Sequence, residues 1–122
     1  MKIERFEDIE AWKRARELVK NIYLVTGEGG LSKDYSLKDQ IRKASISVMS
    51  NIAEGFSRQT NKEFVQFLHV ALGSVTEVQS QLYIARDLKY ISEEEFDKIY
   101  ELASETARLI TGFIKYLKGT NR

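Results

Sequence analysis

Apolar residues recur along most of the chain at spacings of three and four, the periodicity of amphipathic α-helices. Four helical segments are predicted, over residues of about 6–26, 36–55, 61–88 and 92–118. In the last two the spacing alternates between four and three, which indicates helices packed with nearly aligned axes. The third seam is Phe64, Leu68, Ala71, Val75, Val78, Leu82 and Ala85, and the fourth is Phe96, Tyr100, Ala103, Ala107, Ile110, Ile114 and Leu117.

Residues that end or begin helices separate the four segments. The glycine-rich stretch 27–35 follows the first segment, and we expect it to be the most mobile connection. Ser36 is the expected cap of the second segment, and Gly55 stands just beyond its expected end. Capping boxes are predicted to open the third segment at Thr60–Glu63 and the fourth at Ser92–Glu95.

The connections are short and the chain has no proline, so consecutive helices are expected to run antiparallel. The predicted fold is all-α, an antiparallel up-down-up-down four-helix bundle. Its 122 residues suit one domain, 1–122, which can bury a core without disulfides or metals. With 43% hydrophobic and 30% charged residues, the composition excludes a disordered chain.

The beginning of the sequence and its cysteine usage indicate the compartment. Met1–Phe6 turns acidic at once, which argues against a signal peptide, and no apolar run approaches the ~18 residues of a membrane span. There is no cysteine, which excludes disulfides and thiolate chemistry. We therefore expect a cytoplasmic protein with no membrane contact.

The sequence offers little for catalysis. A zinc site needs three or four ligands and a di-iron bundle needs two Glu-x-x-His motifs, whereas His69 is the only histidine. No phosphate-binding loop, nucleophile elbow or dinucleotide fingerprint is present. The expectation is a protein that is not an enzyme and needs no metal, cofactor or small-molecule substrate.

The net charge of the chain is small, but basic residues are concentrated in one part of the sequence. The net charge of +1 is far from the strongly basic profile of most nucleic-acid binders. Between residues 38 and 62, however, five basic side chains face two acidic ones. This excess is either a phosphate-contacting surface or a solvated helical face with internal ion pairs. The candidate phosphate contacts are Arg42, Lys43, Arg58 and Lys62, with Lys13 and Arg14 behind them.

Small, polar and aromatic residues interrupt the apolar pattern. A glycine inside a helix, such as Gly73, costs ~1 kcal/mol relative to alanine and needs a compensating reason. Either neighbouring helices approach closely there, or a polar seam forms within the protein or between subunits. In that seam, Asn51, Glu54 and Glu77 would meet Arg42 or Arg58. Apolar surface outside the two seams, which favours oligomerisation, is expected at Trp12, Tyr23 and Phe67.

One stretch resembles a known family. Residues Gln40 to Gly55 are similar to the S-x-x-S-N-I-A-E-G signature of the four-helix bundle protein family of the 23S ribosomal RNA intervening sequences. The similarity continues through Glu63-Phe64, Gly73-Ser74 and Glu77. The motif positions expected to be structural or at an interface are Asn51, Glu54, Gly55, Gly73, Ser74 and Glu77.

The resemblance implies a four-helix bundle that assembles as a ring-shaped homopentamer. Similar bundles are accessory proteins of diversity-generating retroelements, where they engage a reverse transcriptase and RNA. The expected function is a non-enzymatic homo-oligomer that binds structured RNA or an RNA–protein complex through a basic surface. The alternative is a protein–protein scaffold or adaptor ring that does not touch nucleic acid.

Overall fold

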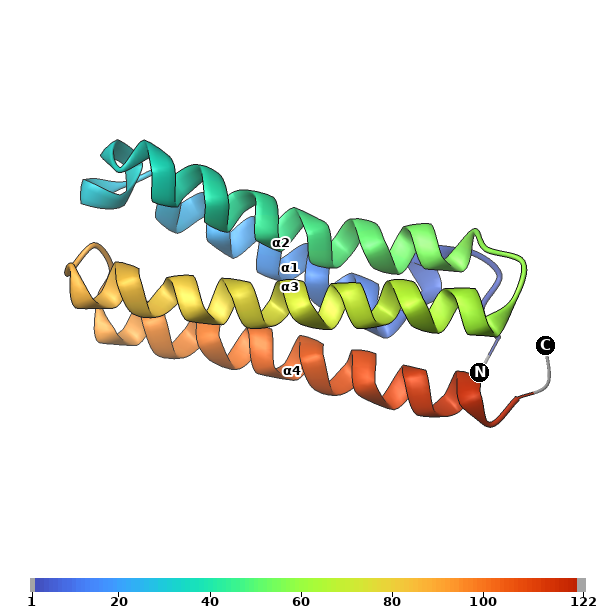
Figure 1. Cartoon of the computed structure of the whole chain (residues 1–122). Helices are drawn as coiled ribbons and strands as arrows, with labels where there is room; N and C mark the ends of the chain where they lie inside the picture. Colours follow the sequence, from blue (N-terminus) through green and yellow to red (C-terminus); the bar gives the residue numbers. More distant parts are fainter. Residues whose placement is uncertain (1, 121–122) are drawn as a thin grey trace.

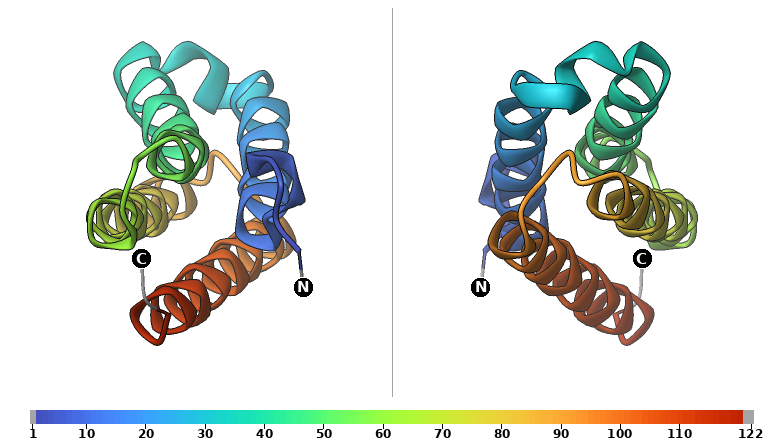
Figure 2. Two further views of the ribbon diagram at one scale, coloured as in Figure 1. Left: turned by 90° about the vertical axis from the view of Figure 1, so that its right-hand side faces the viewer. Right: turned by 90° about the vertical axis from the view of Figure 1, so that its left-hand side faces the viewer.

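The computed structural model describes residues 2–120, and within them the chain folds as the predicted all-α four-helix bundle (Figure 1). Each helix packs against the next, and α1 also packs against α4, so the four surround one core (Figure 2). Two 3₁₀ helices flank α1. The elements are η1 (Phe6–Asp8), α1 (Glu10–Thr26), η2 (Gly29–Lys33), α2 (Tyr35–Phe56), α3 (Asn61–Asp87) and α4 (Glu93–Lys118).

The predicted capping box is complete at α4, only its threonine half forms at α3, and the predicted cap of α2 is replaced by another residue. The Ser92 hydroxyl accepts from the Glu95 amide at 3.0 Å while the Glu95 carboxylate accepts from the Ser92 amide at 2.9 Å, which completes the predicted capping box. At α3 the Thr60 hydroxyl accepts from the Glu63 amide at 3.2 Å. The expectation of Ser36 as the cap of α2 is wrong, because the Asp34 carboxylate accepts from the Leu37 amide instead.

The connection between α1 and α2 is anchored at two points. Leu31, in η2, is fully buried in the core. The Tyr90 hydroxyl, from the connection between α3 and α4, donates to the Asp34 carboxylate at 3.1 Å, and this hydrogen bond raises the pKa of Tyr90. The Tyr90 ring also lies against Gly30, where a Cβ would come within 2.8 Å of it. Tyr90 therefore joins the connection between α3 and α4 to the connection between α1 and α2.

The predicted seam of α3 is buried along its whole length, but that of α4 shifts by one position in two places. Ile99 and Thr106 are buried, whereas the predicted Tyr100 and Ala107 are only half-buried. A straight α-helix drifts relative to a strict seven-residue repeat, so the line of contact passes to the neighbouring column of side chains. Trp12, expected outside the seams, is in the core and packs edge-on against Phe6.

Helices α2 and α3 approach closely along small residues. The Ser47 and Ser74 hydroxyls lie 2.8 Å apart across the two helices, and the Asn51 amide donates to the Ser47 carbonyl at 2.8 Å. Gly55 lies inside α2 rather than beyond its end, and is buried. The close-approach interpretation is thus confirmed for this pair of helices.

Close approach of α2 and α3 does not explain the glycine at position 73. Gly73 lies on the outer face of α3, and a Cβ built on it meets no atom within 4 Å. Glu77, also exposed, is reached only by the Gln81 amide at 3.5 Å, and Arg42 bonds elsewhere. A pairing of Arg42 with Glu77 inside the bundle is therefore wrong.

Candidate nucleic-acid interface

The predicted basic residues occupy three separate places on the bundle. Arg42 and Lys43 lie in the first half of α2, whereas Arg58 follows Arg42 by 16 residues, just beyond the end of that helix. At ~1.5 Å per residue this separation is about 24 Å. Lys13 and Arg14 lie on α1. The six residues therefore do not form one compact cluster within a protomer.

Most of these cations have a carboxylate partner. The pairs are exposed or half-exposed, and such pairs contribute only ~0–1 kcal/mol, so a phosphate can compete for the cation. This arrangement matches the solvated-face alternative more closely than a dedicated phosphate site. The nitrogen–oxygen distances are 3.0 Å for Lys13–Glu10, 2.9 Å for Arg14–Glu105, 3.1 Å for Lys43–Asp39 and 3.6 Å for Arg58–Glu54.

Arg42 has an internal structural role. Its Nε donates to the Thr26 hydroxyl at 2.7 Å, and its Nη2 donates to the Tyr23 carbonyl at 3.4 Å. The guanidinium also lies 4.1 Å from the centroid of the Tyr23 ring. These contacts join α2 to the C-terminal end of α1, where a positive charge is favourable.

Arg42→Ala should therefore lower the free energy of unfolding by about 1–2 kcal/mol, because a charged hydrogen bond and a ring contact are lost together. Lys43→Ala is the matched control, since it removes the adjacent exposed cation and should change stability by less than ~0.5 kcal/mol. Urea denaturation monitored by circular dichroism measures both. Equal effects of the two substitutions would contradict the structural role of Arg42.

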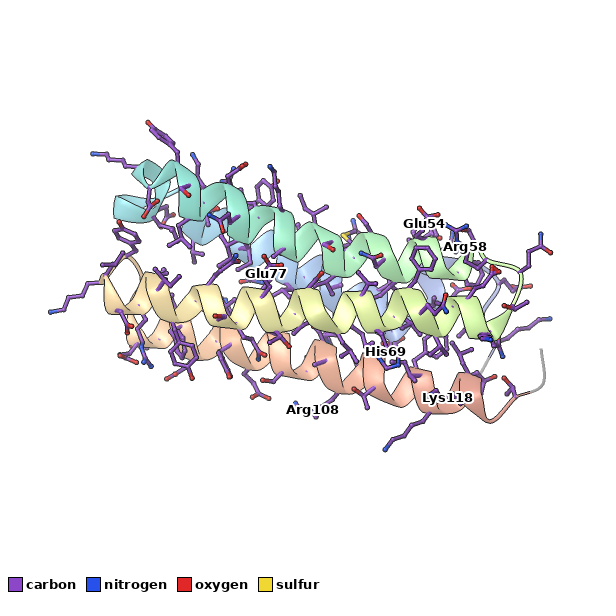
Figure 3. All side chains as sticks on the ribbon, viewed as in Figure 1. Glu54, Arg58, His69, Glu77, Arg108 and Lys118 are labelled. Carbon is purple, nitrogen blue, oxygen red and sulfur yellow. The ribbon has the colours of Figure 1, made fainter. Side chains whose placement is uncertain are left out.

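Lys62 is in a different setting from the other predicted cations. It borders a hollow of about 490 Å³ between the start of α3 and the end of α4, which we call the basic hollow. Val65 and Leu117 contribute apolar walls, and none of the lining residues is acidic. Figure 3 shows His69 between α3 and α4 and Lys118 near the end of α4. The polar residues of the basic hollow are Asn61, Lys62, Gln66, His69, Lys118 and Thr120.

A buried asparagine holds the two sides of the basic hollow together. The Asn61 amide donates to the Leu117 carbonyl at 3.2 Å and to the Thr120 hydroxyl at 2.7 Å. These bonds fix the first residue of α3 against the last turn of α4. The amino end of α3 and the carboxyl end of α4 therefore meet here, where their dipoles offset each other, and the charge that favours a bound anion comes from Lys62 and Lys118.

His69 and Lys118 were missed as site residues by the sequence analysis. The spacing of His69 from Lys62, seven residues or two helical turns, places them on the same face of α3 and was the available signal. The sequence gives no signal that Lys118 lies beside this face of α3, because Lys118 belongs to α4 and reaches it only through the packing of the two helices.

The segment before α1 is also fixed near this end. The Asp8 carboxylate accepts from the backbone amides of Glu4 at 3.1 Å and Arg5 at 3.3 Å. These bonds, that to Glu4 first, lower the pKa of Asp8. The turn holds Ile3 against α4, close to Phe113 and Tyr116.

Within residues 2–120 no group of three or more histidine, aspartate and glutamate side chains is close enough together to bind a metal ion. No helix in that range has the length and apolar character needed to cross a bilayer.

Comparisons with known proteins agree with this fold. A family model described as 23S rRNA-intervening sequence protein matches residues 7–112. Comparison with curated proteins gives no match. Among solved structures, the chain is similar to a protein of unknown function from the S23 ribosomal protein family of Bacteroides thetaiotaomicron VPI-5482. The TM-score is 0.78 and the identity 23%, over 86% of this chain and 98% of that chain, a similarity that shows the fold alone.

Proposed function

Because the chain belongs to the 23S rRNA-intervening sequence protein family, we propose that it is a non-enzymatic homo-oligomeric bundle that binds structured RNA, or an RNA–protein complex. The binding surface is the basic hollow. The observation that supports this proposal most directly is the meeting of Lys62, His69 and Lys118 around a hollow that no carboxylate lines. The ammonium groups of Lys62 and Lys118 could thus bind a phosphate, because no carboxylate lines the hollow to pair with them.

One copy of this hollow offers few contacts. Each neutralised phosphate adds a salt-dependent contribution to affinity, and two or three such contacts give weak binding. Several copies in one assembly bind far more tightly, because each bound hollow raises the effective concentration of RNA at the next. The proposed RNA function therefore depends on oligomerisation.

The outer face of α3 supports an assembly. From Phe64 to Ala85 the helix carries no lysine or arginine and only one carboxylate, Glu77. Val70 and Ile84 are 53% and 47% exposed, and Gly73 between them has open space around it. Depletion of charge is typical of the centre of a protein interface, and a glycine there lets a second helix approach closely. We call this surface, from Gln66 to Ile84, the uncharged face, although the single carboxylate of Glu77 lies on it.

The uncharged face and the basic hollow share α3. Each interface built on the uncharged face would therefore have a basic hollow beside it. The expected assembly is a ring, with the homopentamer as the predicted size. Repetition around a ring would convert a nearly neutral protomer into a surface with regularly spaced cations.

The second candidate is a scaffold or adaptor ring that binds a partner protein and makes no contact with nucleic acid. It is favoured by the net charge of +1 and by the carboxylate partners of Lys13, Arg14, Lys43 and Arg58. The two candidates differ in whether purified protein binds RNA alone.

The deciding measurement is a titration of nuclease-treated protein with structured RNA at several salt concentrations, with duplex DNA for comparison. Replacing Lys62 and Lys118 with glutamine should weaken RNA binding and reduce the slope of log K against log salt by about 2, roughly one per phosphate contact. The matched control replaces Lys20 and Lys33, which removes the same charge outside the basic hollow.

An unchanged slope in the Lys62/Lys118 variant would exclude the basic hollow as the binding surface. Absence of RNA binding by the wild-type protein at the lowest salt would exclude direct recognition and leave the scaffold.

A further inference from the structure

The basic hollow is one of three adjoining hollows around the last turns of α4. It shares Asn61 and Leu117 with a second hollow of about 230 Å³, on whose wall lies Arg58. The second in turn shares Phe113 and Tyr116 with a third, of about 310 Å³. Cations and an apolar aromatic surface are therefore joined at one end of the bundle.

The third hollow is mainly apolar. It runs between the start of α1 and the end of α4, and its walls include Ile3, Ile9 and Leu109. Charged groups occur only at Glu10 and Arg108, and each has a partner outside the lining: Lys13 at 3.0 Å and Glu101 at 2.9 Å. A ligand group here would be apolar or aromatic, not an anion.

Tyr116 stands where the second and third hollows meet. Its ring lies nearly parallel to that of Phe113, with 14° between the planes and 6.0 Å between the centroids. Phe113 thus packs against Tyr116 in an offset arrangement, and Tyr116 is still 55% exposed. Arg58 lies on the wall of the second hollow with Tyr116, whereas Lys115 and Lys118 project to other sides of α4. Tyr116 is therefore an exposed aromatic ring that shares a hollow with the cation of Arg58.

Tyr116 differs from the other exposed tyrosines of the chain. The rings of Tyr23, Tyr35 and Tyr83 each have a cation over the face, at 4.1 Å, 5.2 Å and 4.9 Å from the centroid. No lysine or arginine of the described chain takes that position over Tyr116. Of these four rings, Tyr116 alone offers a face to a ligand next to the basic hollow.

We propose that an unpaired base of the bound RNA stacks on Tyr116 while the neighbouring phosphates lie along Arg58, Lys62 and Lys118. The ligand class is therefore RNA with unpaired nucleotides, such as a loop, a bulge or a single strand, and not a continuous duplex. A positive groove beside an aromatic platform is the usual construction of single-strand binding sites. Bases within an A-form duplex are stacked on each other and cannot reach such a platform. This inference rests on the proposed RNA-binding function.

The test measures binding of a fluorescent single-stranded RNA and of a duplex RNA of equal length, at low salt. Tyr116→Ala should weaken single-strand binding by roughly 5- to 150-fold, the range for loss of one stacked base, and leave duplex binding and the salt slope unchanged. Tyr116→Phe should bind as the wild type does. Tyr116→Leu, which keeps apolar contact with Phe113 but has no ring, should behave as Tyr116→Ala.

Tyr35→Ala is the matched control, because Tyr35 is 73% exposed and lies at the start of α2. Equal single-strand affinities of Tyr116→Ala and Tyr35→Ala, with the salt slope retained, would overturn the stacking inference and leave RNA binding intact. Preference of the wild-type protein for duplex would do the same. Absence of binding to both RNAs would instead overturn the proposed function, and the stacking inference with it.

Discussion

Replacing Gly55 with alanine is expected to lower the free energy of unfolding by about 1–3 kcal/mol, although alanine is the better helix former. A Cβ at this position would lie 2.6 Å from Cδ1 of Phe64 and 2.9 Å from Cβ of Phe67. The Phe64 ring can turn, but the Phe67 Cβ is attached directly to the α3 backbone. Relief of that contact requires α2 and α3 to separate, and the Ser47–Ser74 contact opposes such a separation.

Gly73→Ala is the control for Gly55→Ala, with the opposite expected sign. Nothing lies within 4 Å of the added methyl group, so the protein should gain up to ~1 kcal/mol from the higher helix propensity of alanine. Urea denaturation at one low protein concentration compares the two, since self-association would make stability depend on concentration. A Gly55→Ala protein as stable as the wild type would contradict the packing constraint at Gly55.

Val70→Asp is expected to convert the assembled protein to monomer without unfolding it. Val70 is 53% exposed within the protomer, so the substitution should change protomer stability by less than ~0.5 kcal/mol. At an interface the same carboxylate would be desolvated and would add to the charge of Glu77, seven residues along the same face, at a cost of several kcal/mol. Sedimentation velocity measures the mass, and circular dichroism the fold.

Leu24→Asp is the comparison for Val70→Asp, because Leu24 is similarly exposed, at 58%, but lies on α1. Assembly should survive this substitution. If Val70→Asp leaves the mass of an oligomeric wild type unchanged, the uncharged face is not the interface. A monomeric wild type would contradict oligomerisation itself.

The helices and most of their ends could be predicted because their causes are local. The seam of α3 and the capping box at Ser92 depend on residues three and four positions apart, which the sequence displays directly. Ser36 is the expected cap of α2, whereas Asp34 caps it in the structure; both residue types are good caps, and only the backbone at the end of η2 decides between them.

The candidate site could be predicted only in part, because its causes are not local. Arg42 is held by a hydroxyl and a carbonyl 16 and 19 residues earlier in the chain, and neither group is acidic. Because neither partner is acidic, the pattern of charged residues in the sequence does not show that Arg42 is already bonded. Conversely, Lys118 lies beside Lys62 because α3 packs along α4 and Asn61 bonds to the end of that helix, up to 59 positions away. Side-chain amides that join helix ends have no sequence periodicity.

The bonds of Asn61 to Leu117 and Thr120 also determine when the basic hollow comes into existence during translation. Asn61 and Lys62 are synthesised about 56 residues before Leu117, an interval of roughly 3–11 s at ~5–20 residues per second. A nascent chain that ends within α4 carries Lys62 and His69 but lacks Lys118 and the stacking platform. While it is still on the ribosome, surrounded by ribosomal and messenger RNA, the growing polypeptide therefore has only half of its proposed RNA site. Competence for RNA would be acquired in the final step of bundle closure.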